Sequence, residues 1–317
     1  MRVLVTGAGG QLGREVVELC SSAGDEVVAT DQRTLDVADR DEVLQVVAAA
    51  APDAIVHAGA WTNVDGCETD PDQAYRVNAL GTRHVAEAAR MVGARVCYVS
   101  TDYVFDGTGD RPYHEWDATN PVSVYGRSKL AGETVLAPGD TVVRTSWVCG
   151  RYGRNFVKTI LDRAAQGQPL RVVDDQHGCP TFADDLAGMI RRLVVARLPG
   201  VFHVTNQGPT TWYRFARDAV EAAGFDPSLV TPITTAEMQP PRPAPRPAYS
   251  VLDNAALRLS GIPLLPDHHE PLERLAKELA AHGDPSGPLS GKQGPSGPLS
   301  GKQGPSGPLS GQQGVPG

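Results

Sequence analysis

Residues 1–13 read MRVLVTGAGGQLG, and this stretch decides the fold of the first half of the chain. An apolar run of strand type leads into a glycine turn and then into a helical pattern, with Gly7, Gly10 and Gly13 three residues apart. Glycines at such a turn allow a tight bend, close approach of the backbone to a pyrophosphate, and close packing of helix on strand. Small residues also suit any strand-to-helix turn, but the position between strand and helix favours dinucleotide binding, with the helix N-terminus facing the phosphates.

The same alternation of strand and helix continues outward from this turn. Apolar runs typical of strands occur at 2–6, 26–30, 53–59, 95–100 and 140–146. Helical patterns lie between them, at 11–23, 41–50, 72–92 and 124–136. Strands that are apolar throughout and are separated by helices are typical of a parallel sheet covered on both faces. We therefore predict an α/β protein with a Rossmann-like, doubly wound parallel sheet, formed mainly by residues 1–150.

The second half has a looser pattern, which predicts a smaller α/β substrate-binding domain over 151–283, with parts of this half returning to the first domain. Helices are expected near 156–166, 182–196, 212–223 and 272–281, and strands at 170–175 and 200–206. The proline-rich segment 239–250 is expected to be an ordered loop. From 284 to 317 the decapeptide GPLSGKQGPS recurs without an apolar face, so we expect a disordered tail, a passive extension rather than a binding element.

Composition narrows the class of protein. The formal net charge is −8 with acids and bases interspersed, which argues against a nucleic-acid partner. No stretch approaches 18 apolar residues, so no membrane span is expected. The five cysteines are scattered and form no CxxC pair, as expected for free thiols in a reducing compartment. We expect a cytoplasmic protein.

The end of the second strand bears on the choice of cofactor. Asp31 follows this strand, where a carboxylate accepts hydrogen bonds from an adenosine ribose and favours NADH. Arg33 stands two residues later and could instead pair with a 2′-phosphate, which favours NADPH. Asp36 and Val37 could contact the adenine, or Asp36 could be the N-cap of the next helix. The sequence leaves both pairs of alternatives open.

A second group of residues has the composition of a proton-transfer site. Tyr125 and Lys129 stand four residues apart in a helical pattern, which places them on one helix face. A nearby cation stabilises phenolate and lowers the pKa of a tyrosine from about 10. Thr101 ends the fourth strand, at the edge of a parallel sheet where ligands bind. The YxxxK spacing alone is common by chance, but the order of glycine turn, hydroxyl, tyrosine and lysine indicates a catalytic site.

These features resemble the extended short-chain dehydrogenase/reductase superfamily and, more narrowly, the dTDP-4-dehydrorhamnose reductase family. The stretches that carry the resemblance are TGAGGQLG, STDYVFDG, NPVSVYGRSKLAGE, RTSWV, NFVKTI, DDQHGCPT and RPAYSVLDN. The resemblance implies reduction of the 4-keto group of dTDP-4-dehydro-L-rhamnose to dTDP-L-rhamnose. It further implies that Tyr125 donates the proton, Lys129 lowers the tyrosine pKa and binds the cofactor, and Thr101 hydrogen-bonds the carbonyl.

The same resemblance implies the remaining contacts. The residues expected to line the cofactor are Gly10, Gln11, Leu12, Ala60, Trp61 and Thr62. Trp147 is expected on the same ground to pack on the sugar. Asp102 is expected, from its position directly after Thr101, to contact the substrate or the residues beside it. Arg246 could clamp the pyrophosphate, although a solvated surface arginine is an equal alternative.

Some features depart from the family or are left unassigned. His57 stands where the family commonly has asparagine, and we expect a core residue rather than a catalyst. Some members are described as using Mg²⁺ at a dimer contact, so Mg²⁺ and a homodimer are possible here. No acidic ligands can be assigned in this sequence, and we therefore predict no metal site.

Other reactions share parts of the pattern. A nucleotide-sugar 4,6-dehydratase has an Asp-Glu pair after the threonine, whereas Asp102 and Tyr103 follow Thr101 here. A 4-epimerase, a ketoreductase for another dTDP-4-keto-deoxysugar, and a non-catalytic regulatory relative of the same fold remain as alternatives. The intact set of Thr101, Tyr125 and Lys129 favours an enzyme over the regulatory protein.

Overall fold

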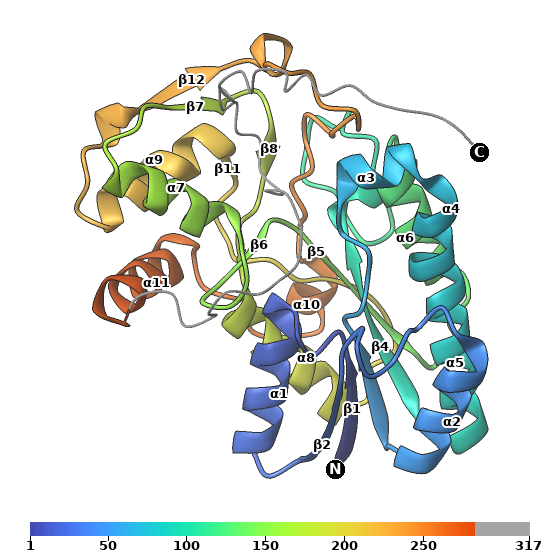
Figure 1. Cartoon of the computed structure of the whole chain (residues 1–317). Coiled ribbons are helices and arrows are strands. Elements are labelled where there is room, and N and C mark those ends of the chain that lie inside the picture. The colour runs from blue at the N-terminus through green and yellow to red at the C-terminus, as the bar shows by residue number, and fades with distance from the viewer. Residues whose placement is uncertain (283–317) are drawn as a thin grey trace, which may run out of the picture.

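The computed structural model describes residues 1–282, which contain a six-stranded sheet with all neighbouring strands parallel (Figure 1). The strand order is β10-β5-β4-β3-β1-β2. The strands are β1 (Arg2–Thr6), β2 (Glu26–Thr30), β3 (Ala54–His57), β4 (Arg95–Thr101), β5 (Thr141–Thr145) and β10 (Gly200–His203). From β1 the chain goes to β2 on one side and to β3 on the other, so the order reverses there. A crevice for ligands is expected at the carboxyl ends of strands at such a reversal.

Helices cover both faces of the sheet (Figure 1). They are α1 (Gln11–Ser22) and α8 (Ala183–Val195) on one face, and α2 (Arg40–Ala50) and α5 (Gly81–Val92) on the other. Successive residues of β1 point to opposite faces, as strand geometry requires. Val3 and Val5 pack in the core beneath α1 and α8, and Leu4 packs in the core beneath α2 and α5. Both faces of the strand are apolar because both are covered.

The smaller region has its own hydrophobic core, around Phe156, Leu170 and Phe215. Its elements are β6 (Val148–Cys149), α7 (Phe156–Ala165), β7 (Leu170–Val173), β8 (His177–Gly178), β9 (Thr181–Phe182), β11 (Thr210–Thr211), α9 (Trp212–Ala222), η3 (Pro227–Leu229), β12 (Val230–Ile233), η4 (Thr235–Glu237) and α11 (His269–His282). Short strands pair as β7 with β12, β8 with β11 and β6 with β9. In Figure 1 this region lies beside the carboxyl ends of the sheet strands.

The remaining elements lie at the carboxyl side of the sheet. They are α3 (Val64–Thr69), α4 (Pro71–Tyr75), η1 (Arg76–Leu80), η2 (Asp102–Val104), α6 (Val124–Glu133) and α10 (Ala255–Leu259). The sequence predicted one helix over 72–92, but the structure divides this segment into α4, the π-helical η1 and α5, and it adds α3, which was not expected. A π-helical turn inside a helix changes the direction of side chains and is often found at functional sites.

The predicted fold class is confirmed. The chain returns to the sheet after residue 182, where α8 packs on one face and β10 pairs with β5. The division into domains at residue 150 stays a prediction, and the expected tail at 284–317 lies outside the described residues. Within residues 1–282, no helix has the length and apolar character needed to cross a bilayer.

Candidate functional site

The glycine turn between β1 and α1 has the geometry of a phosphate cradle. Gly7 has φ +69°, and its carbonyl oxygen accepts a hydrogen bond from the backbone N–H of Gly10 at 2.9 Å. A Cβ on Gly13 would lie 2.1 Å from the Gly7 oxygen, so only glycine lets α1 pack this closely. The N-cap of α1 is Gly10, which has no side chain that could cap the helix. The N–H groups of the first turn of α1 are therefore available to bind a phosphate.

Gln11 and Leu12 follow in the first turn of α1, as predicted for residues that border the pyrophosphate site. Leu12 is buried in the core, so only its backbone faces the turn. Gln11 accepts a hydrogen bond from Asn155 at 3.1 Å, which joins this turn to the start of α7.

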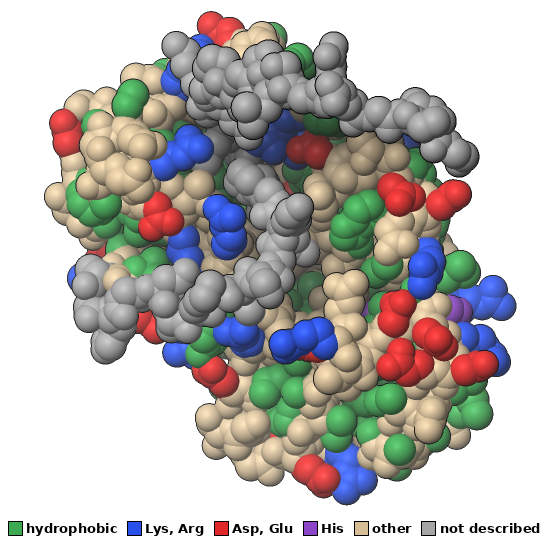
Figure 2. All heavy atoms as spheres, viewed as in Figure 1, with side chains coloured by type: hydrophobic (Ala, Val, Ile, Leu, Met, Phe, Trp, Pro, Cys, Tyr) green, Lys and Arg blue, Asp and Glu red, His purple; other side chains and the backbone are tan. Residues whose placement is uncertain are grey.

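A pocket of about 280 Å³ lies beside the glycine turn, at the end of β2. Its lining includes Asp31, Arg33 and Arg14. Asp31 accepts hydrogen bonds from the Arg33 guanidinium at 2.7 and 3.2 Å, which lowers the pKa of the carboxyl. The Arg33 side chain is 89% exposed, so the guanidinium is available to a ligand. Figure 2 shows several Lys and Arg side chains in the middle of the face of the molecule that is in view, between the sheet and the smaller region.

The structure corrects one interpretation of Asp36. Asp39, not Asp36, is the N-cap of α2 and accepts a hydrogen bond from the Glu42 N–H. Asp36 instead lies in the preceding loop, where Arg76 donates to it at 3.2 Å. Val37 is buried and packs against Gly81, at the start of α5. The predicted adenine contacts of Asp36 and Val37 stay predictions.

The loop after β3 contains Ala60, Trp61 and Thr62, the predicted flank of the cofactor. Asn78 holds this loop: it accepts from the Trp61 N–H at 2.8 Å and donates to the Trp61 carbonyl at 3.1 Å. Asn78 also donates to Ser128 of α6 at 3.0 Å. Sequence reasoning missed Asn78, because a lone asparagine inside a helical pattern gives no signal until the π-helical turn directs it inward.

Thr101 lies at the carboxyl end of β4, as predicted, and both Thr101 and Asp102 are buried. The Thr101 hydroxyl donates to Asp102 at 3.0 Å and accepts from the Tyr103 N–H at 3.2 Å. The other carboxyl oxygen of Asp102, Oδ2, has no hydrogen-bond partner among the described residues. Burial raises the pKa of Asp102 to about 6, although the hydroxyls of Ser250 and Thr101 act in the opposite direction.

Tyr125 lies in the first turn of α6, which begins after the N-cap Ser123. Its ring meets that of Tyr103 edge to face, with 5.7 Å between centroids. Burial and the Asp102 carboxylate raise the pKa of Tyr125, and the neighbouring Thr101 hydroxyl lowers it. The structure thus brings Thr101, Asp102 and Tyr125 to one place. The phenol stays protonated at neutral pH, as a proton donor must.

Lys129 lies one turn further along α6 and is 2% exposed. Its ammonium donates to the Val99 carbonyl at 2.7 Å and lies 4.1 Å from the centre of the Tyr98 ring. Burial lowers the pKa of Lys129 to about 7, and the Glu133 carboxylate opposes this shift. Lys129 is therefore held beneath β4, and its predicted effect on the pKa of Tyr125 stays a prediction.

Trp147 and Arg246 are both held in fixed positions. Trp147 has φ +48°, an uncommon conformation for a bulky residue, and stacks on Trp212 with 3.7 Å between centroids. Arg246 pairs with both oxygens of Asp65 at 3.0 Å, and its side chain is only 6% exposed. The alternative of a solvated surface arginine is therefore wrong. The sugar and pyrophosphate contacts of these residues stay predictions.

His57 lies in the core and not in the crevice. Its ring bonds to the hydroxyls of Thr6 at 2.6 Å and Thr82 at 3.1 Å, and it is 0% exposed. Burial lowers its pKa to about 3, so the imidazole is neutral.

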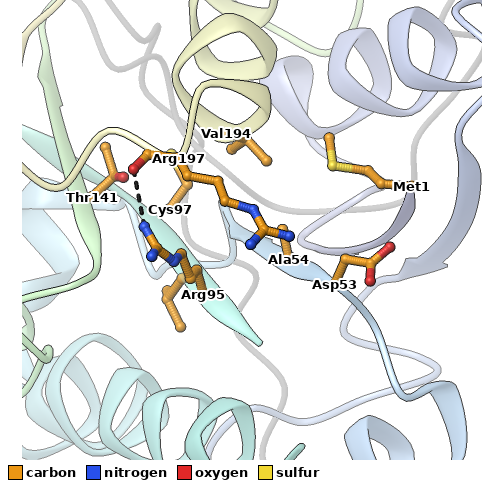
Figure 3. Close-up of a pocket in the computed structure, with 9 residues that line it drawn as sticks. Met1, Asp53, Ala54, Arg95, Cys97, Thr141, Val194 and Arg197 are labelled. Atoms are coloured by element: carbon orange, nitrogen blue, oxygen red, sulfur yellow. Dashed lines mark hydrogen bonds between the residues drawn. The ribbon is translucent and has the colours of Figure 1, made fainter. Parts of the chain in front are cut away.

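A second hollow lies at the opposite edge of the sheet, where β3, β4 and β5 begin (Figure 3). Its volume is about 20 Å³, enough for about one water molecule. Arg95 crosses it and donates to the Arg197 carbonyl at 2.9 Å. This hollow is too small for a metabolite, and the amino edge of a parallel sheet is not where ligands bind.

The comparison with known families agrees with this geometry. The sequence model of the RmlD substrate binding domain family matches residues 1–281. The chain belongs to this family. The resemblance inferred from the sequence is thereby confirmed.

Two relatives of this RmlD-family chain are named as reductases of dTDP-linked sugars. The dTDP-4-dehydrorhamnose reductase of Streptomyces griseus is 43% identical over 270 residues, which cover 82% of this chain and 88% of the relative. The dTDP-4-keto-6-deoxy-D-glucose reductase of Streptomyces niveus is 42% identical over 265 residues, 82% of this chain and 91% of the relative.

A solved structure extends this likeness to the fold. The crystal structure of dTDP-4-dehydrorhamnose reductase from Bacillus anthracis in complex with NADP matches with a TM-score of 0.83 at 39% identity. The match covers 87% of this RmlD-family chain and 99% of the other.

Proposed function

We propose that the protein is an NADPH-dependent oxidoreductase that reduces the 4-keto group of dTDP-4-dehydro-L-rhamnose to give dTDP-L-rhamnose. One observation carries the proposal: Thr101, Asp102 and Tyr125 meet at the carboxyl end of β4, with Lys129 buried behind them. This edge of the sheet also holds the glycine turn of β1. A cofactor bound at the turn and a substrate held by these residues would therefore share one crevice.

The charges near β2 favour NADPH over NADH. A 2′-phosphate carries a negative charge that Arg33 and Arg14, which both line the pocket beside the turn, can pair with. Asp31 alone would favour a free ribose hydroxyl, but the Arg33 guanidinium already neutralises its charge. The relative from Bacillus anthracis, whose structure contains NADP, supports the same choice. Bound NADPH would supply the hydride that is added to C4 of the sugar.

Tyr125 and Thr101 act on the oxygen that gains charge. The raised pKa keeps Tyr125 protonated, so the phenol can donate its proton to the forming alkoxide. Thr101 turns its hydroxyl from Asp102 to the same oxygen and stabilises the developing charge. Lys129, with a pKa lowered to about 7 by burial, would bind the cofactor and act on the pKa of Tyr125 from the next turn of α6.

Two arginines form the proposed site for the substrate diphosphate. Arg242 and Arg246 share the single carboxylate of Asp65, at 3.5 and 3.0 Å, which leaves one positive charge in excess. Burial, and to a smaller extent the charge of Arg246, lower the pKa of Arg242 to about 10, while Asp65 opposes this shift. A diphosphate would supply the missing negative charge, and Tyr103 connects this pair to Tyr125.

A second candidate is the reduction of another dTDP-linked 4-keto-deoxysugar. The relative from Streptomyces niveus is named for a different keto sugar and is 42% identical to this chain. This identity is close to the 43% of the dTDP-4-dehydrorhamnose reductase from Streptomyces griseus, so it supports the alternative about equally. The nucleotide and the 4-keto group are common to both candidates, so the same catalytic residues would serve either.

A cytoplasmic location and a homodimer are also parts of this proposal. Five free, buried cysteines support the cytoplasmic location.

The test is NADPH oxidation by purified protein with dTDP-4-dehydro-L-rhamnose. We expect turnover by the wild type and a loss of about 10²- to 10⁴-fold in kcat for Tyr125→Phe, with an unchanged Kd for NADPH. Tyr75→Phe, at an exposed tyrosine of α4, is the matched control and should keep full activity. A wild-type protein that binds NADPH but turns over no dTDP-4-keto sugar would exclude the reductase function. Undiminished turnover in Tyr125→Phe would exclude the proton donor.

A further inference from the structure

Three side chains with metal-binding donors meet outside the crevice, where α9 packs against the start of α11. Asp218 of α9 and His268 and His269 at the beginning of α11 each offer one ligand atom, and these atoms all lie within 4.8 Å of one another. Figure 1 shows α9 and α11 in the smaller region, on the far side from α6. The proposed reduction uses none of these residues.

His268 is buried with one ring nitrogen left unpaired. It is 2% exposed, and its ring packs edge to face on Phe215 with 5.9 Å between centroids. Its Nδ1 lies 3.1 Å from the Gln207 carbonyl, which can only accept, so Nδ1 carries the proton. The lone pair is therefore on Nε2, and Nε2 has no hydrogen-bond partner among the described residues. An imidazole whose only function was to cap the Gln207 carbonyl would gain nothing from a buried, unpaired acceptor.

His269 also has its proton on Nδ1 and its lone pair on Nε2. Its Nδ1 lies 2.6 Å from the Asp267 carboxylate, which fixes the proton on Nδ1 and directs the Nε2 lone pair elsewhere. The Nε2 atom lies 3.6 Å from Asp218 Oδ2. Histidines that bind metals commonly donate the other ring N–H to a carboxylate or a backbone carbonyl. His269 donates to the Asp267 carboxylate, and His268 donates to the Gln207 carbonyl.

The spacing suits a small tetrahedral ion. Metal–ligand bonds of about 2.1 Å in a tetrahedron separate the ligand atoms by about 3.4 Å. The Nε2 of His269 lies 3.6 Å from Asp218 Oδ2, and the other ligand separations are at most 4.8 Å. The rings of His268 and His269 are stacked 4.1 Å apart, so both the half-exposed His269 and Asp218 would turn toward His268 when an ion binds. Two nitrogens and one carboxylate oxygen favour a transition metal over Mg²⁺ or Ca²⁺, which prefer oxygen ligands.

We propose that Asp218, His268 and His269 form a site for one transition-metal ion, with Zn²⁺ the best fit and a water molecule in the fourth position. The ion would join α9 to the N-terminus of α11 and satisfy the unpaired Nε2 of His268. It would therefore stabilise the packing of α11 on the smaller region. Nothing in this site depends on the proposed reductase function.

Calorimetric titration of chelator-treated full-length protein with Zn²⁺ tests the site. We expect one Zn²⁺ per chain for the wild type, and a rise in Tm when Zn²⁺ is added. His269→Gln and Asp218→Asn should each raise the Kd for Zn²⁺ at least about tenfold, as loss of a ligand requires. Both side chains are partly exposed, so these variants should fold, which circular dichroism checks.

His114→Gln is the matched control. His114 also pairs with a carboxylate, that of Asp253 at 3.1 Å, but within residues 1–282 no second histidine completes a ligand set there. This variant should bind Zn²⁺ as the wild type does. All five cysteines are buried, so thiolates should not compete for the ion. Absence of saturable Zn²⁺ binding by the wild type, or equal Kd values for the wild type and His269→Gln, would overturn the proposal.

Discussion

The Asp102 carboxyl shows how a single residue of the site acts on the whole protein. It is 2% exposed, and its Oδ2 has no hydrogen-bond partner among the described residues. Burial raises its pKa from 3.8 to about 6, so the folded protein keeps a proton that the unfolded chain releases. The free energy of unfolding therefore falls as the pH rises from about 4 to about 6. Above that range Asp102 is ionised in the folded protein too, and its contribution no longer changes with pH.

Asp102→Asn should remove this cost. The amide has a similar shape and can still accept from the Thr101 hydroxyl, but it carries no charge. We expect the free energy of unfolding to rise by about 1–3 kcal/mol at about pH 7.5 and to change little at about pH 4. Urea denaturation at the two pH values measures the difference. The same gain at both would contradict a cost of ionisation.

Asp106→Asn is a control in which the change in stability at neutral pH should have the opposite sign, because folding lowers the pKa of Asp106. The Thr108 N–H and the Asn120 and Thr108 side chains lower the pKa of Asp106 to about 2. Its stabilisation is present above about pH 4 and is lost as the pH falls through about 2. The asparagine variant should therefore be less stable than the wild type at neutral pH.

At the residue scale, the sequence predicted the reacting groups better than their surroundings. Thr101 and Tyr125 could be found because their spacing and their positions at element ends repeat a known arrangement. Asn78 could not be found, because its function depends on a π-helical turn that side-chain periodicity does not reveal. The pairing of Arg246 with Asp65, 181 residues away in sequence, depends on tertiary structure and was equally hidden.

At the scale of elements, the contact between the glycine turn and α1 decides whether the phosphate site exists. We expect Gly13→Ala to displace α1, because the new methyl would lie 2.1 Å from the Gly7 oxygen. The variant should lose about 1–3 kcal/mol of stability and bind NADPH at least about 100-fold more weakly. Gly188→Ala, inside α8 with nothing within 4 Å of the new methyl, should instead gain about 0.5–1 kcal/mol. Tight NADPH binding by Gly13→Ala would contradict the cradle.

A second prediction at the scale of elements concerns the π-helical η1, which contains Asn78. Asn78→Ala leaves the Trp61 N–H without its present acceptor and the Trp61 carbonyl with only the Cys67 thiol as a donor among the described residues, so it should cost about 1–3 kcal/mol of stability. The loosened loop should also raise the Kd for NADPH about tenfold, equivalent to about 1.4 kcal/mol. Fluorescence titration with NADPH measures the second effect, and Gln166→Ala at the exposed end of α7 is the control. An unchanged Kd would show that this loop does not contact the cofactor.

Sequence patterns predicted the strands and helices of the sheet because these elements are long and buried on predictable faces. The first strand and helix occur within one residue of the expected bounds. Elements set by tertiary contacts were not predicted: the two-residue strands β8 and β11 pair only because distant segments meet. The helix α3 is short and contains Gly66, so its periodicity was too weak to detect.

At the scale of the whole molecule, the cores on the two faces of the sheet, the core of the smaller region and the proposed site are all formed by the described residues. The family match ends at residue 281, close to the end of α11. We expect removal of residues 284–317 to leave kcat, KM and Tm unchanged, because the proposed reaction requires only residues 1–282. Steady-state kinetics and thermal denaturation of the truncated protein check this expectation. A marked loss of turnover would show that the C-terminal repeats contribute to function.

The destination of the hydride tests the central claim most directly. The protein would be supplied with NADPH deuterated at C4 of the nicotinamide, on the transferred face, together with dTDP-4-dehydro-L-rhamnose. The account predicts dTDP-L-rhamnose that carries one deuterium at C4 of the sugar, detected by nuclear magnetic resonance and mass spectrometry. Oxidation of the cofactor without deuterium in the sugar, or deuterium at any other carbon, would contradict it.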